Sequence, residues 1–119
     1  MNIQFSDLIE NAPHAPGVYK MYDTENNLLY VGKAKNLSNR LHQYLDISKL
    51  ELHKQVMRTL VARVDWETVP TESDALLREQ ELIKTQKPKY NIIRSCIHQY
   101  FSDFRKSNDW VKNHVSGNH

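Results

Sequence analysis

Alternating apolar and polar positions predict a β-hairpin near the start of the chain. Residues 17–22 (GVYKMY) and 28–31 (LLYV) are rich in the β-branched and aromatic side chains that strands favour. Polar, turn-forming residues fill the segment 23–27 between them, and the hairpin should end at Gly32. A third β-rich segment, 64–69, is closed by Pro70 and predicts a third strand.

Between the hairpin and the third strand, the spacing of apolar residues predicts two helices. Asn36 is a suitable N-cap for the first helix, whose apolar line would be Leu37, Leu41 and Leu45. Apolar residues at positions 56, 57, 60 and 61 indicate the second helix.

The second half of the chain should be mostly helical. Thr71 opens a capping-box pattern (TESD) and a helix that should run to about residue 86, before Pro88 stops it. Beyond Asn91, apolar residues recur at helical spacing and predict one or two further helices. The order ββααβα predicts an α+β fold with a small three-stranded antiparallel or mixed sheet flanked by helices. We expect one domain over residues 1–94 and a helical extension over 95–119.

Composition indicates a globular protein in water. The chain has 119 residues, which is room for a single modest core, and no apolar run approaches the roughly 18 residues of a membrane span. Its first residues lack the basic region of a secretory signal. The lone Cys96 fits a reducing compartment, so we expect a cytoplasmic protein.

The distribution of charge says more than the net charge of +2. Residues 33–63 hold seven Lys and Arg against two acids, and residues 65–81 hold six acids against one Arg. Residues 84–94 then hold four cations and no acid. Two basic blocks of this kind can follow a phosphate backbone, although solvated helix faces have the same composition.

One carboxylate of the helix over 71–86 lies on the apolar side of a helical wheel. Ala75, Leu76, Leu82 and Ile83 form an apolar stripe, and Glu79 falls in its middle. An ionised carboxylate that faces a core is costly unless an arginine, backbone donors or a metal ion compensates it. The alternative is a partly exposed glutamate at the edge of a small core.

Five other polar residues lie on or beside these predicted elements, where their side chains could take part in a site. Tyr19 and Tyr30 lie on the two hairpin strands, where they could do no more than pack together. Arg40 and Tyr44 are four residues apart on the predicted first helix, adjacent to its leucine line. Lys33 directly follows the end of the hairpin, where its side chain should be firmly held and face solvent.

Together these residues resemble the signature of the GIY-YIG nuclease family. The segments 17–19 (GVY) and 30–32 (YVG) are similar to its GIY and YIG motifs, with one β-branched residue, valine, in place of another. The likeness continues over 33–37 and at Arg40, resumes over 71–79, and ends with 82–91. Within the family it is greatest to the N-terminal nuclease domains of the UvrC branch, from bacterial nucleotide excision repair. After Asn91 the sequence leaves that pattern.

The resemblance implies a role for each candidate residue. Glu79 would hold one divalent cation, Mg²⁺ or Mn²⁺. Arg40 would bind the scissile phosphate, and one of the two tyrosines would be the general base. Lys33 would lower the pKa of a neighbouring tyrosine. Tyr44 would join the phosphate-side hydrogen bonds, and Asn91 would be a supporting polar residue near the site. The implied site residues are Tyr19, Tyr30, Lys33, Arg40, Tyr44, Glu79 and Asn91.

Two classes of function follow from these observations. The first is a stand-alone, metal-dependent endonuclease that cuts duplex, damaged or branched DNA. The second is a DNA-binding or accessory module that acts only with a partner protein in repair or recombination. The aromatic tail could bind that partner, mediate self-association, or pack on the domain's own sheet; its aromatic residues are Tyr100, Phe101, Phe104 and Trp110. The preferred DNA structure and the choice between nicking and double-strand cleavage stay open.

Overall fold

The computed structural model describes residues 4–95 and residue 99, and these form the predicted α+β fold with a short additional helix before the hairpin. In chain order they are α1 (Phe5–Leu8), β1 (Gly17–Tyr22), β2 (Leu28–Ala34), α2 (Leu37–His42), 3₁₀ turns at Gln43–Leu45 and Ile47–Lys49, α3 (Leu52–Leu60), β3 (Arg63–Thr68) and α4 (Glu72–Gln86). Residues 89–95 are also helical. The aromatic tail that was expected to pack or bind a partner lies outside the described residues.

The three strands form one sheet in the order β2-β1-β3, and both pairings are antiparallel. The sheet is therefore antiparallel rather than mixed. The hairpin loop is held by Asp23, whose carboxylate accepts the backbone N–H groups of Glu25 and Asn27. Asn26 adopts the left-handed conformation with φ 65° that asparagine tolerates in turns. Strand β2 continues past Gly32 to Ala34, so the hairpin is longer than its pattern indicated.

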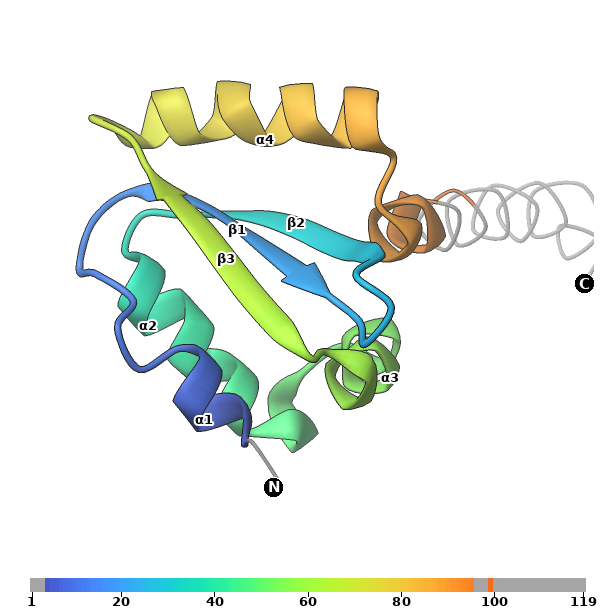
Figure 1. Ribbon diagram of the computed structural model, residues 1–119. Helices are drawn as coiled ribbons and strands as arrows, with labels where there is room; N and C mark the ends of the chain where they lie inside the picture. The colour runs from blue at the N-terminus through green and yellow to red at the C-terminus, as the bar shows by residue number, and fades with distance from the viewer. Residues whose placement is uncertain (1–3, 96–98, 100–119) are drawn as a thin grey trace, which may run out of the picture.

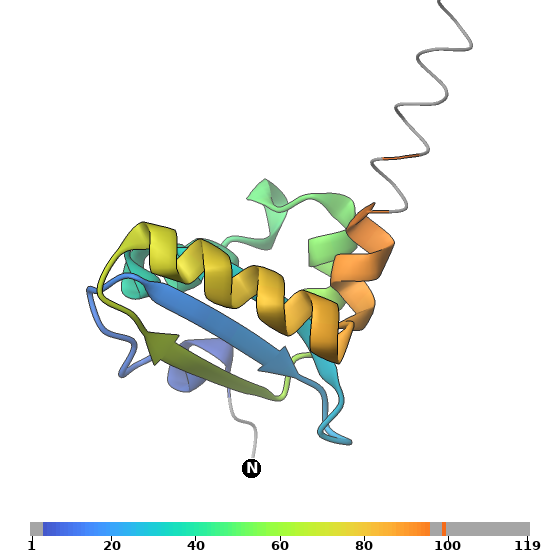
Figure 2. The ribbon, with the colours of Figure 1, turned by 90° about the horizontal axis from the view of Figure 1, so that it is seen from above.

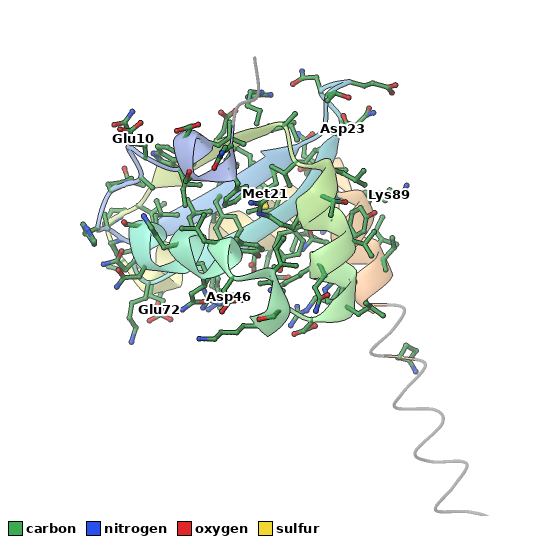
Figure 3. The ribbon with its side chains drawn as sticks, turned by 90° about the horizontal axis from the view of Figure 1, so that it is seen from below. Glu10, Met21, Asp23, Asp46, Glu72 and Lys89 are labelled. Carbon is green, nitrogen blue, oxygen red and sulfur yellow. The ribbon has the colours of Figure 1, made fainter. Side chains whose placement is uncertain are left out.

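Helices cover both faces of the sheet. Helix α4 lies across one face, and α1, α2 and α3 lie against the other (Figure 1, Figure 2). On the α4 side, Val18 and Val31 pack with Ala75 and Leu82. The larger core lies on the opposite side, and Figure 3 shows its Met21 in the middle of the molecule, beneath the helices. Among the described residues, none of the helices combines the length and apolar character that a bilayer crossing requires.

Four residues of the predicted apolar patterns are exposed instead of buried: Leu45, Val56, Leu60 and Leu76. Leu45 is 43% exposed, because the helix tightens into a 3₁₀ turn at Gln43 and Tyr44 takes the buried position. With three residues per turn rather than 3.6, that turn brings the third residue after Leu41 onto the core side. Leu76, at the edge of the second stripe, is 44% exposed.

The ends of α4 are fixed as the sequence predicts. The Thr71 hydroxyl oxygen accepts the backbone N–H of Asp74 at 3.2 Å, which satisfies one of the free donors of the first turn. Lys87 adopts a left-handed conformation with φ 48° and donates its N–H to the Ile83 carbonyl. Such a residue ends a helix, and the buried Pro88 cannot continue it.

Candidate active site

The glycine that ends the second motif allows a tyrosine to lie across the hairpin. Gly32 pairs with Tyr19 in the β1–β2 register, and a Cβ atom on Gly32 would come within 2.3 Å of the Tyr19 hydroxyl oxygen. Tyr30 pairs with Met21, so the two tyrosines are diagonal neighbours with ring centres 6.1 Å apart. The GVY and YVG motifs therefore place two phenols on the same face of the hairpin.

A third tyrosine completes an aromatic cluster beneath these two. Tyr44 from the 3₁₀ turn shares a hydrogen bond of 2.8 Å between its hydroxyl and that of Tyr19, and both side chains are buried. Burial raises the pKa of Tyr19 well above its ordinary value, and the neighbouring phenols Tyr44 and Tyr30 raise it further. Burial likewise raises the pKa of Tyr44. The hydroxyls of Tyr19 and Tyr44 thus bond to each other, and both phenols are uncharged at neutral pH.

Glu79 projects from α4 toward the end of β2. Its carboxylate accepts the backbone N–H of Lys33 at 2.9 Å, and the side chain is half-buried. Within residues 4–95 and 99, no arginine or lysine side chain pairs with this carboxylate. An arginine, backbone donors or a metal ion could compensate the charge of this carboxylate. Among the described residues the structure provides one backbone donor. The rest of the carboxylate is available to a ligand.

Asn91 supports β2 rather than entering the pocket. Its side-chain oxygen accepts the Val31 N–H at 2.8 Å, and its side-chain nitrogen donates to the Val31 carbonyl at 3.0 Å. Because β2 is at the edge of the sheet, Asn91 satisfies two backbone groups that would otherwise lack a strand partner. It holds the strand between Tyr30 and Gly32 in place.

These side chains surround a pocket of about 200 Å³. It is lined by Tyr19, Tyr30, Gly32, Lys33, Arg40, Lys54, Glu79 and Arg94. Five of the seven residues implied by the sequence therefore line one cavity, and the other two lie directly behind it through the contacts of Tyr44 and Asn91.

The expected effect of Lys33 on a tyrosine is not what the structure shows. The Lys33 ammonium lies 3.8 Å from the carboxylate of Glu72 at the start of α4. Burial raises the pKa of Tyr30, with the carboxylate of Glu79 contributing, and the positive charges of Arg94 and then Arg40 are the main influences that lower it. The backbone N–H of Lys33 donates to the carboxylate of Glu79.

Lys54 and Arg94 are pocket residues that the sequence did not single out. Lys54 comes from α3, and Arg94 comes from the helical segment 89–95. Neither belongs to a motif, and only the tertiary fold brings their segments to the hairpin. The sequence signal for these two residues was the excess of basic residues, because Lys54 lies in the basic block 33–63 and Arg94 lies in the basic block 84–94.

The pocket suits a hydrated divalent cation. Glu79 offers a hard carboxylate oxygen, and the volume leaves space for the water ligands that Mg²⁺ keeps when a protein supplies few of its own. The described residues contain no cluster of three or more His, Cys, Asp or Glu side chains that could form an all-protein cage. A metal ion here would share its coordination with water and substrate.

Comparison with known proteins gives the same result as the geometry. Residues 15–92 match the family model of the UvrC-like GIY-YIG domain. The UvrABC system protein C of Anaplasma phagocytophilum is 50% identical over 78 residues, which is 66% of this chain and 13% of that protein. The homologous protein of Geobacter sp. (strain M21) is 43% identical over 96 residues, which is 80% of this chain and 15% of that protein. This chain thus matches only about one seventh of the length of these relatives.

A solved structure matches almost over its full length. The GIY-YIG N-terminal endonuclease domain of UvrC from Thermotoga maritima, bound to its catalytic divalent cation, magnesium, has a TM-score of 0.66 and 33% sequence identity. The match covers 76% of this chain and 98% of that one. By fold, motifs and sequence, this chain belongs to the family of UvrC-like GIY-YIG endonuclease domains.

Proposed function

We propose that this chain is a metal-dependent DNA endonuclease that hydrolyses phosphodiester bonds in the pocket between β2, α2 and α4, as a stand-alone catalytic unit. The observation that carries the proposal is the convergence of one carboxylate, two phenols and an arginine on a single cavity. Its likeness to an endonuclease domain that binds magnesium supports the same chemistry. Duplex, damaged and branched DNA are the substrates to test.

Arg40 has the role of binding the phosphate that is cut. It lies on the pocket wall with an exposed side chain, and no acid of the described residues pairs with it. A guanidinium can donate two parallel hydrogen bonds to phosphate oxygens and stabilise the charge that develops on them during the reaction. Lysine would not reproduce this geometry.

Tyr30 is the better placed of the two tyrosines to take a proton from the attacking water. The Tyr19 hydroxyl is already bonded to Tyr44, and the pKa of Tyr19 is raised well above its ordinary value by burial. Tyr30 lines the pocket, burial raises its pKa, and the positive charge of Arg94 lowers it. In the reaction, the phenolate form of Tyr30 takes the proton of the water that attacks phosphorus, the bond to the 3′ oxygen breaks, and that oxygen takes a proton from solvent.

Glu79 would hold the divalent cation, which when bound supplies positive charge to the phosphate and to the leaving oxygen. The N–H of Lys33 fixes one carboxylate oxygen of Glu79 and so orients the group toward the cavity. Asn91 and Gly32 act indirectly. Asn91 sets the path of β2, and Gly32 leaves room for the Tyr19 ring.

Cleavage of supercoiled plasmid and of a branched oligonucleotide, with Mg²⁺ or Mn²⁺, tests the proposal. Wild type should cut in a metal-dependent manner, Glu79→Ala should not, and Glu81→Ala should cut like wild type. Glu81 is the matched control, because it lies on the same helix and contacts Arg78 instead of the pocket. Equal cutting by Glu79→Ala would show that the site is wrong. A wild-type protein that binds DNA and never cuts it would favour an accessory module.

A further inference from the structure

Helix α3 contributes one side chain to the pocket although it carries none of the family motifs. The helix is fixed in place by Met57, which is buried in the larger core. Arg58 fixes it further, with its guanidinium 3.9 Å from the centre of the Phe5 ring and its Nε donating to the Tyr44 carbonyl at 3.2 Å. These contacts hold Lys54, one helical turn earlier, beside the tyrosine cluster.

The ammonium group of Lys54 rests on aromatic rings and not on a carboxylate. Its Nζ atom lies 5.4 Å from the centre of the Tyr30 ring and 5.7 Å from that of Tyr44. Burial lowers the pKa of Lys54, and the nearby cations Arg94 and Arg40 lower it too, against the opposing influences of Glu51 and Glu79. No hydrogen bond or ion pair to this ammonium is formed by the residues that the structure describes.

Several other lysines of the domain do have a carboxylate partner. Lys20, Lys33 and Lys49 each lie within 4 Å of a carboxylate oxygen. A half-buried ammonium without such a partner is costly to keep, and an anion that enters the pocket removes that cost. The pocket wall also carries Arg40 and Arg94, so cations outnumber its single carboxylate.

We propose that Lys54 is a phosphate-binding residue of this pocket, which holds a phosphate of the bound DNA strand on the tyrosine side of the site. The inference rests on the proposed function, which it extends from the family motifs to helix α3. An ammonium at this place supplies a point charge to phosphate oxygens, next to the two-pronged contact of Arg40. The tyrosine rings beneath it keep the lysine chain directed into the cavity.

The test is DNA binding by Lys54→Met as a function of salt, with Lys54→Arg and Lys49→Met alongside. All proteins carry Glu79→Gln so that the DNA stays intact, and a short labelled duplex is titrated by fluorescence anisotropy. Loss of one phosphate contact reduces the slope of log affinity against log salt by about 0.9. We expect that reduction and about tenfold weaker binding for Lys54→Met, with recovery of the slope in Lys54→Arg.

Lys49→Met is the matched control for net charge, since Lys49 is 80% exposed, pairs with Asp46 and is absent from the pocket wall. It should leave the slope unchanged. A wild-type slope in Lys54→Met, an equal loss in Lys49→Met, or no recovery in Lys54→Arg would each overturn the inference. The proposed function is tested separately, by DNA cleavage with the protein that keeps Glu79. Absence of cleavage there would contradict the proposed function, whatever the result for Lys54.

Discussion

Arg78 and Glu79 are neighbours on α4, yet their side chains belong to two charged clusters that differ in kind. Arg78 reaches over β3 to the closed cluster, defined as Lys20, Glu67, Arg78 and Glu81. Glu79 reaches over β2 to the open cluster, defined as Arg40, Lys54, Glu79 and Arg94. Within the closed cluster each charge has an opposite charge in contact, whereas in the open cluster none of the described side chains pairs with another.

The two carboxylates show the difference most clearly. Glu67 accepts hydrogen bonds from both Lys20 and Arg78. Burial opposes its ionisation, but these two cations outweigh burial and hold the pKa of Glu67 below its usual range. Glu79 has one backbone donor. A satisfied charge network contributes to the fold, and an unsatisfied one in a cavity is completed by ligands, here a cation and a phosphate.

The largest expected effect comes from comparing two single variants, one with an arginine of the open cluster replaced by methionine and one with the arginine of the closed cluster replaced. Arg40→Met removes the phosphate contact and should lower the rate of DNA cleavage by about 100-fold or more, with folding unchanged. Arg78→Met should leave the rate within a factor of about two, because Arg78 contacts Glu67 and Glu81 outside the pocket. Single-turnover cleavage of plasmid DNA measures both. Similar losses of rate in the two variants would contradict the distinction.

A second prediction concerns Asn91, whose side-chain oxygen and nitrogen both have hydrogen-bond partners, as the carboxylate of Glu67 does. Asn91→Leu leaves the N–H and carbonyl of Val31 without their partners. We expect the free energy of unfolding to fall by about 2 kcal/mol, measured by urea denaturation. The control is Asn39→Leu on the exposed side of α2, which should change stability by less than about 0.5 kcal/mol. Equal stability of both variants would show that the amide does not hold the strand.

Local patterns predicted the parts of the fold and site that depend on neighbouring residues. Thr71 caps its helix as its motif indicates, and the polar residues 23–27 form the turn between the two predicted hairpin strands. Contacts between distant segments had no such signal. Lys54 is brought to the pocket by the packing of α3, and Lys33 turns to Glu72 because α4 begins beside the end of β2.

The closed tyrosine pair should appear in the alkaline stability of the protein. Burial raises the pKa of Tyr44 in the folded protein above the value of about 10 expected in the unfolded chain. Below pH 10 both states keep the proton. Above it the unfolded chain loses the proton first, so the free energy of unfolding falls as the pH rises.

Tyr44→Phe removes the ionisable phenol of Tyr44, so its ionisation no longer changes the free energy of unfolding. The decline in stability above pH 10 should therefore be shallower than in wild type by about 1.4 kcal/mol per pH unit. Urea unfolding at pH 9, 10 and 11 measures it. Parallel declines in the two proteins would mean that Tyr44 ionises as easily when folded as when unfolded.

The smallest expected effect is that of Glu67→Gln on stability. The closed cluster is partly exposed, so its ion pairs are screened by water, and the free energy of unfolding should fall by about 1 kcal/mol. The difference from wild type should shrink in 1 M salt, where exposed charges interact less. Cleavage of DNA should continue at the wild-type rate. A large loss of activity with full stability would place Glu67, and not only Glu79, in the site.

Binding of Mn²⁺, followed by electron paramagnetic resonance in wild type, Glu79→Gln and Glu67→Gln, tests the central claim most directly. Circular dichroism confirms that each variant is folded. If the open carboxylate holds the cation, wild type and Glu67→Gln bind one Mn²⁺ with similar affinity, and Glu79→Gln loses it. Undiminished binding by folded Glu79→Gln, or its loss only in Glu67→Gln, would contradict the assignment of the metal to the open cluster.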